Sequence, residues 1–130
     1  MTAEEKWLFN RINQERQAAG RKPLKWGGRL EKAARRHSRD MVNSNFFAHV
    51  SPTRGNLVRR LHEVGIGSWK RIGENVAGAA TAELAFQVWM LSPKHKASML
   101  KPSYTTAGIG IAQGGPYGAM FTIDFADEPH

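Results

Sequence analysis

Apolar residues recur at helical spacing through the first two thirds of the chain. Residues 2–19 are predicted to form a first helix that ends at Gly20. Thr2 and Glu5 have the spacing of a capping box at its start. A second helix is predicted over residues 29–44, with an inward face of Leu30, Ala33, Ala34, His37 and Met41. The segments "RKPLKWGG" and "NFFAHVSPTRG" contain Pro and Gly, and we expect irregular connections there.

Two shorter helices follow in the prediction. One covers about residues 55–64, and its inward residues would be Leu57, Val58 and Leu61. The other is capped by Thr81 and runs to about residue 91, and its inward residues would be Leu84, Val88 and Leu91.

The last third of the chain has the pattern of strands. "TTAGIGIAQGG" and "GAMFTIDFA" are separated by the turn signal "GGPYG", which predicts an antiparallel hairpin. "IGENVAGA" is compatible with a short strand or with an extended loop. With helices early and strands late, we predict one α+β domain over residues 1–130.

Charge and composition narrow the classes of partner. The net charge of +8 would attract polyanions such as nucleic acid, anionic lipid or acidic wall polymers. On amphipathic helices, basic residues usually form the face that is exposed to solvent. The charge pattern therefore leaves open whether these residues bind a polyanion or only face solvent. Without cysteine the chain can form neither disulfides nor thiolate zinc sites.

The sequence gives two indications about the membrane and the compartment. No apolar run is long enough to span a bilayer, so we expect no transmembrane segment. The start, "MTAEEKWLF", has the pattern of a helix and not of a signal peptide. We therefore expect either a cytoplasmic protein or one whose leader has been removed.

Three titratable residues lie among special backbone residues: His49 in "FAHVSP", Glu74 in "IGENVAG" and His95 in "SPKHKASML". Their separations of 25 and 21 residues form no local motif, so the fold itself would have to assemble any site. Two histidines and a carboxylate can hold zinc with an open coordination position, or can act as acid–base groups without metal.

His95 has a local setting that favours the neutral imidazole. Ser92 is a good N-cap and Pro93 a good first residue for a short helix, which places His95 about three residues in. The positive field of the helix start disfavours imidazolium, and so do Lys94 and Lys96. The same stretch of sequence also fits an ordinary surface histidine on a connecting turn.

The remaining candidates have simpler interpretations. We expect His37 to be a hydrogen-bonded core residue, His62 to be exposed, and Asp124 to face solvent from a strand; His130 is terminal. The tryptophans are expected to pack, and not to stack on bases. The serines lack a Gly-x-Ser-x-Gly setting, and no P-loop, dinucleotide or calcium motif is present.

Taken in order, several stretches resemble the CAP superfamily, also called the SCP domain, and most closely its cysteine-free bacterial branch. They run from "LFNRINQERQAAGRKPLKW" through "LEKAARRHSRDMVNSNFFAHVSP" and "GENVA" to "VWMLSPKHKASMLKPSYTTAGIGIA". The resemblance implies an α-β-α sandwich with a central antiparallel sheet between helical layers. It also implies a cavity to which His49, Glu74 and His95 contribute.

The chain departs from the family pattern at three points. "QVWMLSPKH" lacks the second cavity glutamate of many eukaryotic members, Lys94 stands where bacterial members usually have glycine, and the eukaryotic disulfides are absent. A complete four-residue metal site is therefore not expected.

The resemblance also guides the expected function. It favours a secreted or envelope-associated binding module, monomeric, that takes zinc or another divalent metal, a lipid, a small ligand or an anionic wall polymer. The alternatives are a metal- or His/Glu-dependent hydrolase acting on wall or peptide substrates, and a basic nucleic-acid-binding protein, the least favoured of the three.

Overall fold

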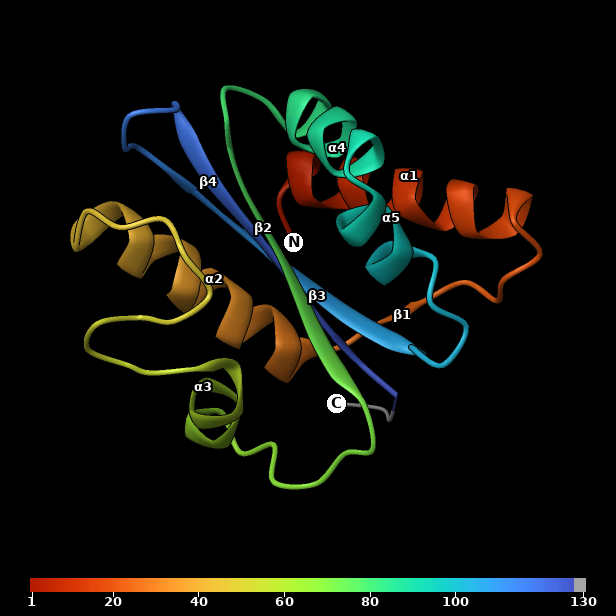
Figure 1. Ribbon diagram of the computed structural model, residues 1–130, viewed down its shortest axis with the longest axis horizontal. Coiled ribbons are helices and arrows are strands. Elements are labelled where there is room, and N and C mark those ends of the chain that lie inside the picture. The colour runs from red at the N-terminus through yellow and green to blue at the C-terminus, as the bar shows by residue number, and fades with distance from the viewer. Residues whose placement is uncertain (128–130) are drawn as a thin grey trace.

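Five helices pack on the two faces of a four-stranded sheet in the computed structural model, which describes residues 1–127 (Figure 1). The helices are α1 (Ala3–Ala18), α2 (Gly28–Asn43), α3 (Leu57–Glu63), α4 (Ala82–Leu91) and α5 (Pro93–Met99). The strands are β1 (Lys25–Trp26), β2 (Ile72–Ala79), β3 (Thr106–Gln113) and β4 (Ala119–Ala126). Helices α2 and α3 lie on one side of the sheet and α1, α4 and α5 on the other, which confirms the predicted α-β-α sandwich.

The strand order is β1-β3-β4-β2, and the three long strands are antiparallel. β2 therefore forms one edge of the sheet, and "IGENVAGA" is a strand and not a loop. The short β1 was predicted as part of an irregular connection, but it pairs parallel to β3 and makes the sheet mixed. The Lys25 N–H donates to the Thr105 carbonyl and the Gly27 N–H to the Ala107 carbonyl, which holds this two-residue strand in place.

Helix α2 lies directly on β3 because two glycines leave room for it. A Cβ built on Gly108 would overlap the main chain of Glu31, and one on Gly110 would overlap the main chain of Arg35. The alternating glycines of "AGIGIA" therefore bring a helix backbone against a strand backbone. This contact fixes α2, and with it the start of the loop that carries His49.

The predicted inward face of α4 was wrong. Leu84, Val88 and Leu91 are 46%, 50% and 85% exposed, and the buried residues are Ala82, Ala85, Phe86 and Trp89. The helix is apolar almost all round, so spacing alone does not select a face. The indole of Trp89 does select one, since its Nε1 donates to the Val76 carbonyl at 3.0 Å. No helix within residues 1–127 is long and apolar enough to cross a bilayer.

Helix α3 also differs from its prediction. Leu61 is buried as expected and Leu57 is half-buried, but Val58 is 42% exposed. The residue that takes its place toward the sheet is Arg60, which is 3% exposed. A buried guanidinium on a short amphipathic helix requires acceptors, and these belong to the site described below.

A second buried arginine ties the end of α1 to the C-terminal half. Arg16 is 1% exposed and donates four hydrogen bonds of 2.8 to 3.1 Å to the main-chain carbonyls of Lys22, Met99, Lys101 and Tyr104. Burial lowers the pKa of this guanidinium, and the charge of Arg21 lowers it further. The capping box at the other end of α1 forms as predicted, with Thr2 and Glu5 bonding each other's main chain.

Candidate functional site

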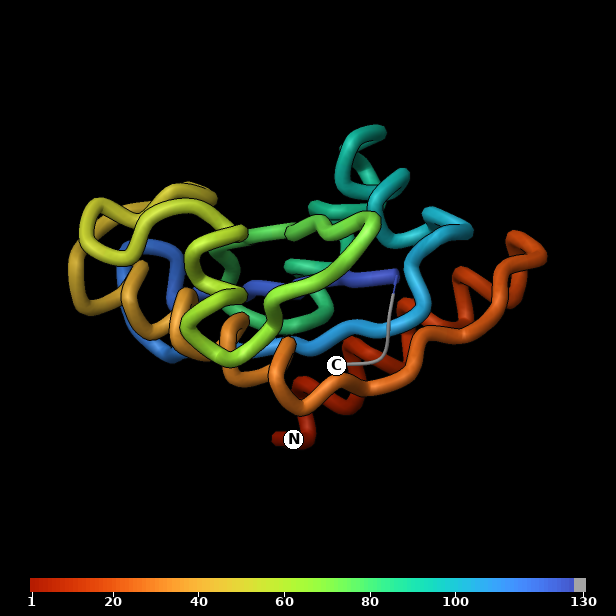
Figure 2. The backbone as a smooth tube through the Cα atoms, turned by 90° about the horizontal axis from the view of Figure 1, so that it is seen from below, coloured from red at the N-terminus to blue at the C-terminus, as the bar shows by residue number. Residues whose placement is uncertain are grey.

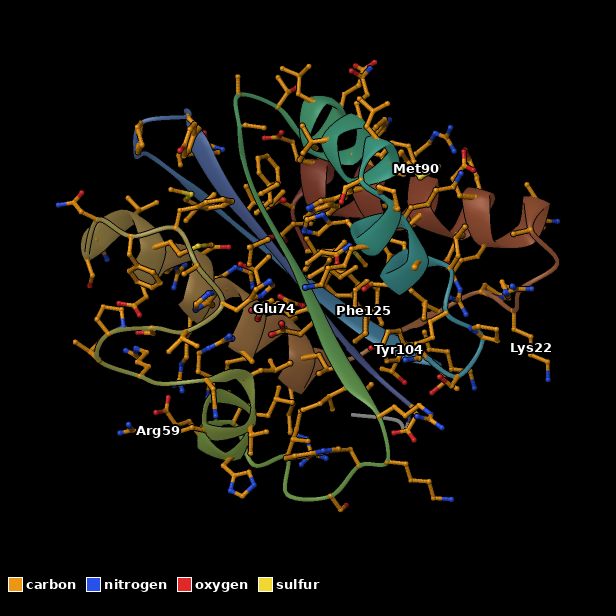
Figure 3. The ribbon with its side chains drawn as sticks, in the orientation of Figure 1. Lys22, Arg59, Glu74, Met90, Tyr104 and Phe125 are labelled. Atoms are coloured by element: carbon orange, nitrogen blue, oxygen red, sulfur yellow. The ribbon has the colours of Figure 1, made fainter. Side chains whose placement is uncertain are left out.

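Glu74 is the centre of a buried polar cluster on the α2–α3 face of β2 (Figure 3). Its side chain is only 2% exposed. Oε1 accepts hydrogen bonds from His49 Nδ1 at 2.9 Å and from Arg60 Nη2 at 2.8 Å, and Oε2 accepts one from Arg60 Nη1 at 2.8 Å. Arg60 Nη2 also donates to the main-chain carbonyl of His49 at 2.7 Å. Arg60 thus holds both the carboxylate and the loop that presents the histidine.

The charge of Glu74 is fixed by these partners. Burial alone would raise its pKa, but hydrogen bonds from Asp124, His49 and Arg60, together with the charge of Arg60, outweigh burial. They hold the pKa of Glu74 well below its usual range, so the carboxylate stays ionised at any physiological pH. A carboxylate this weakly basic is a poor general base.

Asp124 was predicted to face solvent, and this was wrong. It is fully buried on β4, where every residue is buried, and it lies directly opposite Glu74 in the strand register. Burial is the main reason that the pKa of Asp124 is raised well above its usual range, and the charge of Glu74 adds to it. Its oxygens have no donor within residues 1–127, since the neighbouring side chain is itself a carboxylate. Protonated Asp124 satisfies the pair by donating to Glu74.

His37 is a core residue, as predicted. Its ring is buried, and Nε2 lies 2.7 Å from the Ala48 carbonyl, which requires a proton on that nitrogen. Nε2 also lies 3.9 Å from Glu74 Oε1. Burial lowers the pKa of His37 despite the nearby charge of Glu74, so the ring is neutral and braces the loop before His49. His62 is exposed, as expected, and His130 lies outside the described residues.

His95 occupies the third position of α5, as the sequence predicts. Ser92 does not cap the helix with its side chain, because its Oγ lies 2.8 Å from His95 Nδ1 instead. The pKa of His95 is lowered, as expected, but the largest cause is burial, followed by the charges of His49 and Lys94. The imidazole therefore remains neutral to a lower pH than an exposed histidine does.

The two histidines approach the edge of the sheet from opposite faces. The Glu74 side chain points to the α2–α3 side and bonds His49. The next residue, Asn75, points to the other side and donates from Nδ2 to the His95 carbonyl at 3.1 Å. In Figure 2 the loop after α2 and the α5 helix stand on either side of β2. The fold thus brings all three predicted residues to the outer edge of one strand, with 49% of the His49 side chain exposed.

The predicted binding of a metal by His49, Glu74 and His95 stays a prediction. Within residues 1–127 no group of three His, Cys, Asp or Glu side chains is arranged to hold a metal ion. Glu74 is unsuited as a ligand because both of its oxygens face the Arg60 guanidinium. The histidines are better suited: each has its Nδ1 engaged by an oxygen inside the fold, and neither Nε2 has a partner in the described part of the chain. Metal-binding histidines usually have this pattern.

Comparison with known proteins shows which family the chain resembles. Residues 9–125 match the family "CAP: Cysteine-rich secretory protein family". The Bacillus subtilis protein YkwD is 40% identical over 116 residues, which cover 88% of this chain and 45% of YkwD.

Solved structures agree with this family. An extracellular SCP-domain protein from Bacillus anthracis superposes with a TM-score of 0.87 at 28% identity, over 96% of this chain and 40% of that protein. NaASP2, solved with Zn²⁺, has the same fold, with a TM-score of 0.67 at 13% identity over 98% of this chain and 81% of NaASP2. The chain thus spans less than half of the two bacterial proteins. On the family match and the identity to YkwD, the chain belongs to the CAP family.

Proposed function

We propose that this CAP domain is a binding module that acts outside the bacterial cell, and that His49 and His95 bind a divalent metal ion such as Zn²⁺. The observation that carries the proposal is the hydrogen bonding of the two imidazole rings. In each, Nδ1 is held by an oxygen of the fold and Nε2 is left without a partner. Neutral imidazole nitrogens of this kind are preferred zinc ligands.

Glu74 would then orient His49, in place of binding the metal. A carboxylate that accepts the second ring N–H of a ligating histidine fixes the ring and raises its basicity. Arg60 keeps Glu74 ionised and in place for this role. The crystallisation of NaASP2 with Zn²⁺ adds support from the same fold.

The same geometry argues against a hydrolase in which Glu74 is the general base. A general base must accept a proton near neutral pH, and the pKa of Glu74 is held too low for that. The extracellular relative supports the proposed location outside the cell, and a lipid or another small ligand is a further proposal for the same surface.

Calorimetric titration with ZnCl₂ tests the proposal. The wild type and the control His62→Ala, which removes an exposed histidine on α3, should bind with one-to-one stoichiometry. His49→Ala with His95→Ala should show no binding, while circular dichroism confirms that it is folded. Absence of zinc binding by the wild type, or unchanged binding by the double variant, would refute the proposal. Turnover of a peptide or wall substrate would favour the hydrolase.

A further inference from the structure

Helix α2 carries a concentration of positive charge that the histidine site does not use. Between Gly28 and Asn43 it contains five basic residues and two acidic ones. Both acids are already engaged. Glu31 bonds Arg35 and the indole of Trp26. Asp40 is buried and accepts hydrogen bonds from the hydroxyls of Ser44 and Ser51.

Three of the basic residues form what we call the α2 stripe: Lys32, Arg36 and Arg39. Spacings of four and three residues put them on one face of the helix, opposite its buried face, over about 10 Å of axis. None forms an ion pair within residues 1–127. Arg35 differs, because Glu5 and Glu31 both neutralise it.

The stripe borders a hollow of about 350 Å³, whose lining is Gly28, Glu31, Lys32, Arg35, Arg36 and Arg39. Gly28 contributes no side chain, and a Cβ added there would meet no atom within 4 Å. Lys32 and Arg39 are exposed and Arg36 is half-buried. Three of the four cations that border the hollow thus have no carboxylate partner within residues 1–127, and its one acid, Glu31, is bound to the fourth, Arg35.

We propose that the α2 stripe binds a linear, base-free phosphodiester polymer of the cell envelope. Cations arranged in a row suit a chain of phosphates better than one phosphate, and arginine pairs well with phosphate oxygens. The exposed aromatic residues lie on other segments: Trp7 on α1, Phe47 after α2 and Tyr117 between β3 and β4. The lining of the hollow contains no aromatic side chain on which bases could stack, and the half-buried Trp26 beside it has its Nε1 bonded to Glu31. The choice of an envelope polymer rests on the proposed location outside the cell, which the extracellular relative from Bacillus anthracis supports.

The test measures binding of fluorescent poly(glycerol phosphate) over a range of salt concentrations. The stripe variant carries Lys32→Gln, Arg36→Gln and Arg39→Gln. A control removes the same charge from separate parts of the surface with Lys6→Gln, Arg59→Gln and Arg71→Gln, all at exposed residues without ion pairs within residues 1–127. His49→Ala with His95→Ala separates this site from the histidine pair.

We expect the stripe variant to lose affinity by at least about tenfold, and its slope of log K against log salt to fall by roughly 2 to 3. The control should lose much less, and the histidine variant should bind as the wild type does. Equal losses in stripe and control variants would overturn the proposal, because diffuse net charge would then be responsible. Absence of binding at about 50 mM salt would overturn it too. Single-stranded DNA binding as tightly as the polymer would overturn the assignment to a base-free ligand.

Discussion

Replacing Arg60 with methionine should destabilise the protein strongly, because it leaves the buried carboxylate of Glu74 without its counter-charge. Arg60 and Glu74 are each 2% exposed at the side chain, and two hydrogen bonds of 2.8 Å join them. Two unit charges about 4 Å apart attract by about 4 kcal/mol at an effective dielectric constant of about 20. Breaking a buried pair by removing one partner costs about 3–5 kcal/mol, and we expect this loss for Arg60→Met near pH 7.

The loss should depend on pH in a defined direction. In the wild type the pKa of Glu74 is lowered from 4.5, so the carboxylate contributes stability above about pH 4.5 and that contribution is lost as pH falls. Without Arg60, burial should raise the pKa of Glu74, and the variant should lose stability as pH rises through the new value. The difference between the two proteins should therefore be large at about pH 7 and shrink toward about pH 4.5.

Urea unfolding followed by circular dichroism at both pH values measures these differences. Arg54→Met is the matched control, since Arg54 and Glu63 form a 3.4 Å pair with side chains 43% and 33% exposed. Exposed pairs contribute less than about 1 kcal/mol, so this variant should be nearly neutral. A cost of Arg60→Met below about 1 kcal/mol at pH 7, or an equal cost at both pH values, would refute the assignment of charge in this cluster.

Three further substitutions test other parts of the fold, each by urea unfolding. Gly110→Ala should lower the free energy of unfolding by about 3 kcal/mol or more, because the new Cβ meets the backbone of α2. Gly28→Ala meets no atom and should be neutral or stabilise the protein by about 0.5–1 kcal/mol. Similar effects of the two substitutions would contradict the close contact of α2 with β3. Asp124→Asn keeps a donor for Glu74 and should cost less than about 1 kcal/mol of stability at pH 7. The raised pKa of Asp124 makes the wild type lose stability as pH rises, so the stability of the variant relative to the wild type should rise with pH. If the difference in stability between this variant and the wild type did not change with pH, Asp124 would not be protonated in the wild type. Arg16→Met should cost about 2–6 kcal/mol of stability, because it leaves two buried carbonyls without the donors that Arg16 provides. A cost below about 1 kcal/mol would show that water takes the place of the guanidinium.

The sequence predicts the architecture well because periodicity and caps are local signals. The capping box of Thr2 and Glu5 forms as expected, and so does the hairpin around "GGPYG". The apolar face of α2 is also correct, with His37 inside it. The two-residue strand β1 was missed, because its only reason to be extended is a partner about 80 residues away in the chain.

The candidate site was predicted only in part, because half of it consists of partners chosen by the fold. His49, Glu74 and His95 stand out by their Gly, Pro and Ser neighbours, and all three lie at the β2 edge. Arg60 lies in a basic amphipathic stretch, where a charged residue is expected to be solvated. Asp124 follows the alternation of a half-exposed strand, a rule that fails when helices cover both faces of the sheet.

The four hydrogen bonds of Arg16 have a consequence for where this protein can fold. Three of them join the end of α1 to residues 83 to 88 positions away, the kind of long loop that a disulfide closes in many small secreted proteins. A guanidinium forms such a cross-link in any redox environment and needs no oxidant or isomerase. The domain should therefore reach the same stability in the presence of strong thiol reductants, and it can be displayed on cells or expressed in a reducing cytosol without mispaired intermediates.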